Sequence, residues 1–257
     1  SMAMRIAIHD TGAPDVLVYE SFDPGTPGEG EVLIAQEAAG LNFIDVYHRT
    51  GYYPLPALPH GIGMEAAGEV VETGPGVDWL QRGERVAYVT PPPGAYATER
   101  VIPAAKLLKL PDGIGNQLAA GMMLKGLTAQ YLLRQTYQVA PGETILVHAA
   151  AGGVGLILCQ WANHLGARVI GTVGSEEKAE LAKAHGCEFP ILYRQEDVVK
   201  RVKEITDGEG CPVVYDSVGK DTFEKSLDCL KRRGVLVSFG QSSGPVEPVP
   251  TVLLSRK

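Results

Sequence analysis

Short apolar runs separated by turn residues dominate the first half of the chain. The runs with the strongest β character are Met4–Ile8, Val32–Ala35, Gly68–Val71 and Arg85–Val89. Glycine and proline interrupt these runs at residues 24–28, 74–76 and 91–94, where they favour turns. Many short strands with frequent turns predict a partly closed β-barrel in residues 1–124.

The periodicity changes after Gly115. Residues 118–133 have helical spacing, and strands and helices alternate after them. The predicted strands are Thr144–His148, Arg168–Val173, Phe189–Leu192, Val213–Asp216 and Val235–Phe239, and the predicted helices are Val154–Leu165, Glu176–His185, Glu196–Thr206 and Thr222–Leu230. Alternation of this kind predicts right-handed crossovers and a parallel sheet.

A dinucleotide-binding sheet made of two mononucleotide-binding halves has about six strands. The pattern supplies one strand fewer before Lys257. We therefore expect residues 125–257 to form a doubly wound α/β domain whose last strand follows Lys257, in a polypeptide that continues past that residue. The alternative is a naturally short variant of the fold.

Composition and charge exclude several classes of partner. Hydrophobic residues make up 45% of the chain and charged residues 21%, which is typical of a soluble globular protein. The net charge of −7 argues against broad binding to a nucleic-acid backbone. The chain has no apolar run that could span a bilayer and no charged-then-apolar leader. We therefore expect a cytoplasmic protein that binds neither nucleic acid nor membrane.

The cysteines do not form a recognisable disulfide or zinc pattern. Cys159, Cys187, Cys211 and Cys229 are widely spaced, without a C-x-x-C pair. Disulfide scaffolds are rich in cysteine, and zinc sites cluster their ligands. The spacing favours reduced and mostly buried thiols over a structural disulfide.

The most informative local motif is residues 145–155, which read ILVHAAAGGVG. An apolar strand leads into small residues and then a helix, with Ala150, Gly152 and Gly155 in the three positions of the G-x-G-x-x-G pattern. A turn without bulky side chains lets the backbone approach a pyrophosphate, and the helix start offers unpaired N–H groups. Glycine-rich turns also serve packing alone, but this position in an α/β run favours dinucleotide binding.

The end of the second predicted strand bears on the choice of cofactor. NAD-selective folds usually place an acid there to bind the ribose hydroxyls, and residues 171–178 read GTVGSEEK instead. Ser175 could hold a 2′-phosphate by hydrogen bonding and Lys178 by charge. The alternative is a solvated helix start, with Ser175 as N-cap and two glutamates that favour the helix dipole. Both interpretations can hold together.

Several separated motifs resemble one known family. They are Gly40–Tyr47, Ala150–Gly155, Tyr215–Gly219 and Ser238–Gly244. In this order they resemble the quinone oxidoreductase (zeta-crystallin) family, a zinc-free branch of the medium-chain dehydrogenase/reductase superfamily. The resemblance implies a GroES-like catalytic domain in residues 1–124 and a Rossmann NADP(H)-binding domain in residues 125–257. It also implies that NADPH reduces a quinone in a homodimer or homotetramer.

The resemblance assigns roles to individual residues. Those at the cofactor are Asn42 and Thr128 near the nicotinamide, Gly152, Gly153, Val154 and Gly155 at the pyrophosphate, Gly174, Ser175, Lys178 and Tyr193 around the 2′-phosphate, and Phe239, Gly240 and Ser242 in the loop after the fifth strand. Those expected at the substrate are Asn42, Tyr47 and Tyr53. For the two tyrosines, core packing is an equally good explanation.

Zinc-dependent alcohol dehydrogenases are the relatives that must be distinguished. Asn42 and Met64 occupy the positions of their cysteine and histidine ligands. Glu65 remains, but one carboxylate cannot build a tetrahedral zinc site. His60 is better explained as a loop residue bonded to backbone than as a ligand. The sequence therefore predicts a zinc-independent enzyme.

A quinone needs little chemical help from the protein. It is an electrophilic acceptor, so orienting it against the nicotinamide and excluding water are the main tasks. Asn42 could hydrogen-bond the acceptor oxygen. Two alternatives remain open: an NADPH-dependent enone or alkenal double-bond reductase, and a non-enzymatic NADPH-binding relative of the crystallin or RNA-binding type.

Overall fold

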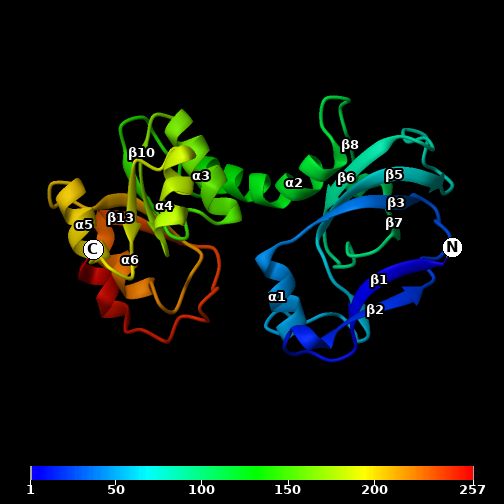
Figure 1. Cartoon of the computed structure of the whole chain (residues 1–257), viewed down its shortest axis with the longest axis horizontal. Coiled ribbons are helices and arrows are strands. Elements are labelled where there is room, and N and C mark those ends of the chain that lie inside the picture. The colour runs from blue at the N-terminus through cyan, green and yellow to red at the C-terminus, as the bar shows by residue number, and fades with distance from the viewer. Residues whose placement is uncertain (1, 257) are drawn as a thin grey trace. The chain divides into compact units, whose positions relative to one another are not determined.

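The computed structural model describes residues 2–256 of the chain. Residues 1–124 and 125–257 form separate compact units (Figure 1). The boundary between them falls inside helix α2 (Asn116–Tyr131). Of the helices in the described residues, none combines the length and apolar character that crossing a membrane requires.

The first unit is built from antiparallel β-structure. One sheet has the strand order β2-β1-β4 and the other has the order β7-β3-β5-β6-β8. The strands are β1 (Ala3–Ile8), β2 (Leu17–Phe22), β3 (Glu31–Gly40), β4 (His60–Gly61), β5 (Glu65–Thr73), β6 (Arg85–Val89), β7 (Glu99–Pro103) and β8 (Leu108–Lys109). The helical segments are η1 (Pro14–Val16), α1 (Phe43–Thr50) and η2 (Ala104–Lys106).

Alternating side chains explain the core of this unit. Val32 and Ile34 on β3 and Val86 and Tyr88 on β6 point to the same interior, two residues apart on each strand. Backbone hydrogen bonds join β1 to the segment that leads into β7, such as the one from the Ile6 N–H to the Tyr96 carbonyl at 2.8 Å. These bonds close part of the β-structure, which agrees with the partly closed barrel predicted from the sequence.

The second unit is an α/β layer structure. Its parallel sheet has the order β11-β10-β9-β12-β13, the 3-2-1-4-5 order of a doubly wound fold. The strands are β9 (Thr144–Val147), β10 (Arg168–Val173), β11 (Phe189–Leu192), β12 (Cys211–Asp216) and β13 (Leu230–Ser238). The helical segments are a π-helical turn (Leu132–Thr136), α3 (Gly153–His164), α4 (Glu176–Ala184), α5 (Val198–Ile205), α6 (Phe223–Cys229) and η4 (Thr251–Arg256).

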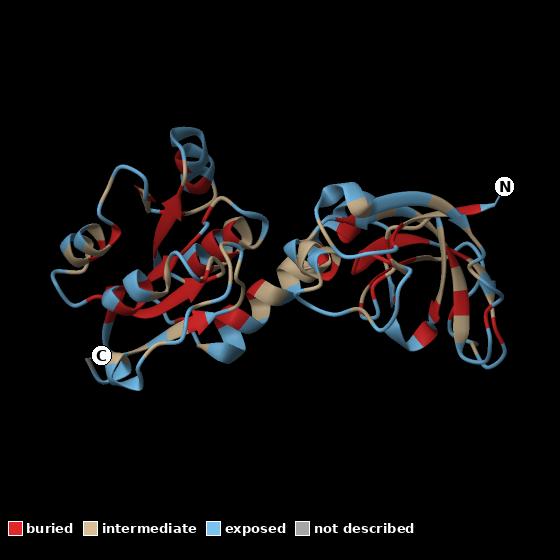
Figure 2. Cartoon of the chain, turned by 90° about the horizontal axis from the view of Figure 1, so that it is seen from below, coloured by how far each residue is buried: buried red, intermediate tan, exposed pale blue. Residues whose placement is uncertain are grey.

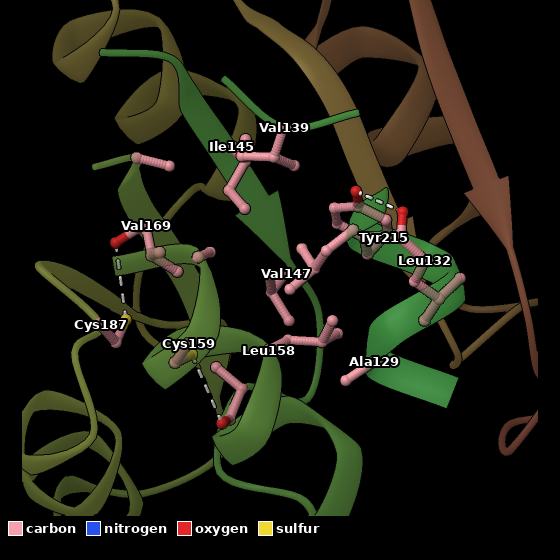
Figure 3. Packing of buried hydrophobic residues seen from close by; sticks show 14 of the residues in the cluster. Ala129, Leu132, Val139, Ile145, Val147, Leu158, Cys159, Val169, Cys187 and Tyr215 are labelled. Carbon is pink, nitrogen blue, oxygen red and sulfur yellow. Dashed lines mark hydrogen bonds between the residues drawn. The ribbon is translucent and has the colours of Figure 1, made fainter. Parts of the chain in front are cut away.

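Both faces of this sheet are buried, and successive strand residues serve opposite faces. Val147 packs with α3 on one side, while Leu146 packs with α5 and α6 on the other. Figure 3 shows the first of these cores, where Val147, Leu158 of α3 and Tyr215 of β12 face a common interior. In Figure 2 the strands of this sheet are red along much of their length. All four cysteines are buried here, as predicted, and none is in a disulfide within residues 2–256.

The element boundaries differ from the sequence prediction in a few places. β13 begins at Leu230 and not at Val235, because residues 231–233 extend the strand although they are exposed and basic. The pairing with β12 shifts register between Cys211 and Val213, which is typical of a bulge. Helix α3 begins at Gly153, one residue before the predicted start.

Candidate functional site

The glycine-rich turn connects β9 to α3. Ala149 has a φ of 50°, in the left-handed region, and the Gly152 N–H donates to its carbonyl at 2.9 Å. Gly152 is the N-cap of α3 and has no side chain to bond the first helical amides. Those amides lack intrahelical partners by geometry and carry the positive end of the helix dipole. The turn therefore offers N–H groups and positive potential to an anion.

Gly155 is required for this geometry. A Cβ atom at Gly155 would lie 2.2 Å from the Ala149 carbonyl oxygen, a backbone atom that cannot swing away. The helix can therefore approach the turn only because residue 155 has no side chain.

A cavity of about 570 Å³ lies next to this turn. Its volume is in the range of cofactor sites, roughly 300–1,000 Å³. The lining residues are His148, Ala149, Ala151, Gly152, Thr172, Val173, Gly174, Lys178, Tyr193, Val198, Val218, Asp221, Thr222, Lys225, Ser242 and Ser243. They follow the carboxyl ends of the strands, at the point where the strand order reverses between β9 and β12. Doubly wound folds bind their ligands at this position.

The tip of β10 supplies one wall of the cavity. The Ser175 hydroxyl accepts a hydrogen bond from the Lys178 N–H at 3.3 Å, so Ser175 is the N-cap of α4 as predicted. Lys178 lines the cavity, and Glu176 and Glu177 are not among its described lining residues. A Cβ at Gly174 would lie 3.2 Å from the Tyr193 hydroxyl oxygen, which places this tyrosine against the strand tip.

The structure brings together only part of the predicted cofactor set at the cavity. Gly152, Gly174, Lys178, Tyr193 and Ser242 line it. The other predicted residues of this unit are not among the described lining residues: Gly153, Val154 and Gly155 in the first turn of α3, Ser175 at the start of α4, Phe239 and Gly240 after β13, and Thr128 on α2.

Contacts within the second unit position these surrounding residues. Thr128 follows Lys125 by about one helical turn, and the Lys125 side chain covers Gly153. The Phe239 N–H donates to the Asp216 carbonyl at 2.9 Å, which ties the segment after β13 to β12.

Sequence reasoning missed several lining residues. His148 directly follows β9, Thr172 lies inside β10, and Thr222 and Lys225 surround the start of α6. His148 lies inside the motif of residues 145–155, but the pattern gives its side chain no role. These side chains reach the cavity only through the sheet order and the packing of α6. Lys225 is a second cation at the cavity besides Lys178.

Asn42 lies in the first unit, where Glu65 holds it. Its side-chain Nδ2 donates to Glu65 Oε1 at 2.7 Å, and the Leu124 N–H donates to Glu65 Oε2 at 2.8 Å. Because a carboxylate only accepts, the Asn42 amide must turn its nitrogen to Glu65. Glu65 is fully buried, and a Cβ at Gly40 would lie 2.3 Å from its Oε1 atom. Asn42 thus has a fixed orientation at the start of α1.

A polar pair, the buried Asp45 and the half-buried Tyr96, supports the same helix start. The Asn42 N–H donates to Asp45 Oδ2 at 2.9 Å, and the Tyr96 hydroxyl donates to the same oxygen. Burial, and then the hydrogen bond to Asp45, raise the pKa of Tyr96 well above its ordinary value. Tyr96 therefore stays protonated and acts as a donor at neutral pH.

Tyr47 and Tyr53 are neighbours in an aromatic cluster of the first unit. Their ring centroids lie 5.0 Å apart, and Tyr52 stacks on Tyr53 at 5.2 Å. Tyr53 remains 40% exposed. The contacts agree with a packing role, and the exposed area leaves room for contact with a ligand, so the geometry is compatible with both predicted roles.

Two residues expected from the sequence at the ligand positions of a zinc enzyme, Asn42 and Met64, lie in the first unit. Met64 is buried, and His60 Nδ1 lies 2.7 Å from the Gly61 carbonyl oxygen, the backbone bond expected from the sequence. Within residues 2–256, no three His, Cys, Asp or Glu side chains come together in a way that could hold a metal ion.

Comparisons with known proteins agree with this architecture. The family model for the alcohol dehydrogenase GroES-like domain matches residues 28–112, and the model named zinc-binding dehydrogenase matches residues 153–257. A quinone oxidoreductase from Pseudomonas aeruginosa is 57% identical over 256 residues, covering 100% of this chain and 79% of the relative. A 2-haloacrylate reductase from Burkholderia sp. is 50% identical, covering 98% and 77%.

A solved structure extends the likeness to three dimensions. The quinone oxidoreductase of Escherichia coli, complexed with NADPH, has a TM-score of 0.96 and 52% identity, covering 98% of this chain and 78% of that one. These similarities span both units. The chain therefore belongs to the quinone oxidoreductase family of the medium-chain dehydrogenase/reductase superfamily.

Proposed function

We propose that this protein is an NADPH-dependent quinone reductase that works without a metal. The observation that carries the proposal is the cavity at the switch point of the parallel sheet, bordered by the glycine-rich turn and by Lys178. The family relationship supports it, because relatives that are more than 50% identical to this chain over the aligned residues include quinone oxidoreductases.

The residues around the cavity fit a dinucleotide phosphate. We assign the pyrophosphate to the turn formed by Gly152, Gly153, Val154 and Gly155, where N–H groups and the dipole of α3 meet an anion. Gly174, Ser175, Lys178 and Tyr193 would surround the 2′-phosphate, which Lys178 neutralises. Thr128, Phe239, Gly240 and Ser242 complete the cofactor set. NADPH supplies the hydride when it is bound.

In the first unit, we assign Asn42 to the acceptor oxygen. Its amide is oriented by Glu65, so it presents a fixed polar group at little entropic cost. We propose that Asn42 also contacts the nicotinamide end of the cofactor, and that Tyr47 and Tyr53 border the acceptor. The hydroquinone product can take its proton from water, so the assignment requires no nucleophile and no strong base.

The absence of a zinc requirement is part of the proposal. It rests on Asn42 and Met64 at the ligand positions and on the engagement of Glu65 by Asn42 and Leu124. We expect metal analysis of purified protein to find substoichiometric zinc and chelators to leave the activity unchanged. One zinc per chain, together with loss of activity on chelation, would refute this part.

The activity is tested by steady-state oxidation of NADPH against a panel of quinones and enones. We expect the highest kcat/KM with a quinone, and a higher kcat/KM with NADPH than with NADH. A panel in which enones or alkenals outperform every quinone would favour a double-bond reductase. The observation that favours this second candidate is the 50% identity to a 2-haloacrylate reductase.

We also propose that the protein is a cytoplasmic homodimer, on the basis of the family relationship. The mass in solution tests the assembly directly. Sedimentation equilibrium that gives the mass of a single chain at micromolar concentration would exclude the homodimer.

A further inference from the structure

A buried chain of polar groups runs beneath the cavity of the second unit. His148, the residue after β9, lies between Thr172 of β10 and Ser226 of α6. Its Nδ1 atom is 2.9 Å from Thr172 Oγ1, and its Nε2 atom is 2.9 Å from Ser226 Oγ. All three side chains are buried, so each hydrogen bond is shielded from water.

This series of hydrogen bonds ends at the carboxylate of Asp216, the last residue of β12. Ser226 Oγ donates to Asp216 Oδ2 at 2.7 Å. The same carboxylate accepts the Thr222 hydroxyl, at 2.7 and 2.8 Å from its two oxygens, and the N–H groups of Val218 and Gly219. Asp216 therefore joins α6 to the loop that follows β12.

These partners determine which nitrogen of His148 carries the proton. The single hydrogen of Ser226 is committed to Asp216, so Ser226 can only accept from His148. Nε2 must therefore carry the hydrogen, and in the neutral ring Nδ1 accepts from Thr172. Burial lowers the pKa of His148, with Asp216 opposing this effect and Lys225 of α6 adding to it, so the ring stays neutral. The donors run in one direction, from Thr172 through His148 and Ser226 to Asp216.

This chain of bonds links the elements that form the cavity. His148 and Thr172 line the cavity themselves, as do Thr222 and Val218 at the other end of the chain. Ala149, next to His148, begins the glycine-rich turn, and Gly174 follows Thr172 by two residues. The His148 bridge therefore adds a side-chain link between the turn and β10 to the backbone bond from the Ala150 N–H to the Thr172 carbonyl, at 3.0 Å.

We propose that His148 is a positioning residue for the dinucleotide, holding the glycine-rich turn and the end of β10 at the spacing that the pyrophosphate and the adenosine ribose require. The inference rests on the proposed cofactor site and adds to it a residue that touches no reacting atom. Because the bridge sets the spacing of the whole site, its loss weakens NADPH and NADH alike. Loss of the Lys178 charge would instead affect NADPH alone.

The test uses a matched pair of substitutions at Thr172. Thr172→Val keeps the shape and removes the hydroxyl, whereas Thr172→Ser keeps the hydroxyl. We expect Thr172→Val and Ser226→Ala each to raise the dissociation constants of NADPH and NADH by roughly three- to tenfold, and Thr172→Ser to remain near the wild-type value. These substitutions should raise KM for the cofactor by a much larger factor than they lower kcat.

Thr206→Val is the control for general destabilisation. Thr206, at the end of α5, donates to the Val202 carbonyl at 2.7 Å and accepts from the Gly210 N–H at 2.9 Å, at the opposite end of β12 from the cavity. We expect this variant to lower the melting temperature without changing either dissociation constant. The double variant Thr172→Val/Ser226→Ala should lose less than the sum of the two single effects, because both act through one imidazole.

The imidazole 15N spectrum gives a readout that does not depend on the cofactor. At pH 6.5, where an ordinary histidine is half protonated, we expect His148 to show a protonated Nε2 and an unprotonated Nδ1. A charged ring, the other tautomer, or Thr172→Val with unchanged dissociation constants would overturn the inference. A wild-type protein that binds neither dinucleotide would instead refute the proposed function, and the positioning role with it.

Discussion

Lys178 is the side chain whose removal most directly tests the choice of cofactor. It lines the cavity, and its ammonium group would form a charge-assisted bond with the 2′-phosphate, worth about 1.5–3 kcal/mol. We expect Lys178→Ala to weaken NADPH binding by roughly ten- to a hundredfold and to leave NADH almost unchanged. Titration of both cofactors into both proteins measures the difference.

Lys183→Ala is the matched control on the same helix. Lys183 pairs with Glu180 at 3.4 Å and is not among the described lining residues of the cavity. It should leave both dissociation constants unchanged. If Lys178→Ala weakened the binding of both cofactors equally, or if the wild type preferred NADH, the tip of β10 would not be the part that recognises the 2′-phosphate.

His148 should make the protein less stable as the pH falls. Burial lowers its pKa in the fold below the unfolded value of 6.5, so the fold accommodates the neutral ring. This contribution to stability is fully present above pH 6.5 and is lost as the pH falls from 6.5 towards the folded pKa. In that window the unfolding free energy should drop by up to about 1.4 kcal/mol per pH unit.

The comparison of two variants isolates this effect. His148→Gln should be less stable overall but should show a shallower pH slope than wild type in urea unfolding between pH 6.5 and 5. His164→Gln, at an exposed histidine of α3, should keep the wild-type slope. His48, whose pKa is also lowered by burial, contributes with the same sign in all three proteins. An unchanged slope in His148→Gln would contradict the prediction.

At the scale of the element, α3 and its turn depend on close backbone approach. A Cβ at Gly155 would lie 2.2 Å from the Ala149 carbonyl oxygen, so Gly155→Ala must push the helix away from the turn. We expect a loss of about 1–3 kcal/mol in unfolding free energy and a weaker affinity for NADPH. Chemical denaturation and cofactor titration measure the two effects.

Gly121→Ala provides the opposite outcome in another helix. Gly121 is exposed in α2, and a Cβ there would meet nothing within 4 Å. Since alanine favours a helix interior over glycine, this change should stabilise the protein by about 0.5–1 kcal/mol. If the two substitutions changed the unfolding free energy in the same direction, close packing at the turn would not explain why residue 155 is glycine.

The elements of the second unit were predictable from the sequence because their signals are local. Buried parallel strands appear as apolar runs, and amphipathic helices lie between them. The predicted start of β13, at Val235, was wrong. Residues 231–233 are basic and exposed, yet they belong to a strand that pairs with β12. Strand pairing is a tertiary contact, and a local polar run carries no sign of it.

At the scale of the whole molecule, a cofactor that binds only the folded chain must raise its stability. NADPH at about 100 times its dissociation constant should add about 2.7 kcal/mol to the unfolding free energy. The described lining residues of the cavity all come from residues 125–257, so the gain should appear in the unfolding of that unit. Calorimetry at increasing NADPH concentration should show a rising melting temperature.

Lys178→Ala should shift this dependence to higher NADPH concentration without removing it. A melting temperature that does not respond to NADPH in wild type would contradict both the cavity assignment and the proposed activity. A response to NADH equal to that with NADPH would leave the cavity assignment intact and contradict the cofactor preference.

The sequence by itself determined the fold class, the position of the glycine-rich turn and the N-cap at Ser175. Each of these depends on residues that are close together in the chain: a strand followed by small residues, or a serine before a helix. Backbone geometry and hydrogen bonding over a few residues are enough to specify such features.

Only the tertiary structure decided which distant side chains meet. His148 reaches Thr172 and Ser226 because the sheet order places β9 next to β10, and because α6 packs on one face of the sheet against β12. Asn42 meets Glu65, 23 residues later, because β3 pairs with β5. A buried polar group is stable only when a partner is present, and that partner is supplied by packing between elements and not by neighbours in the sequence.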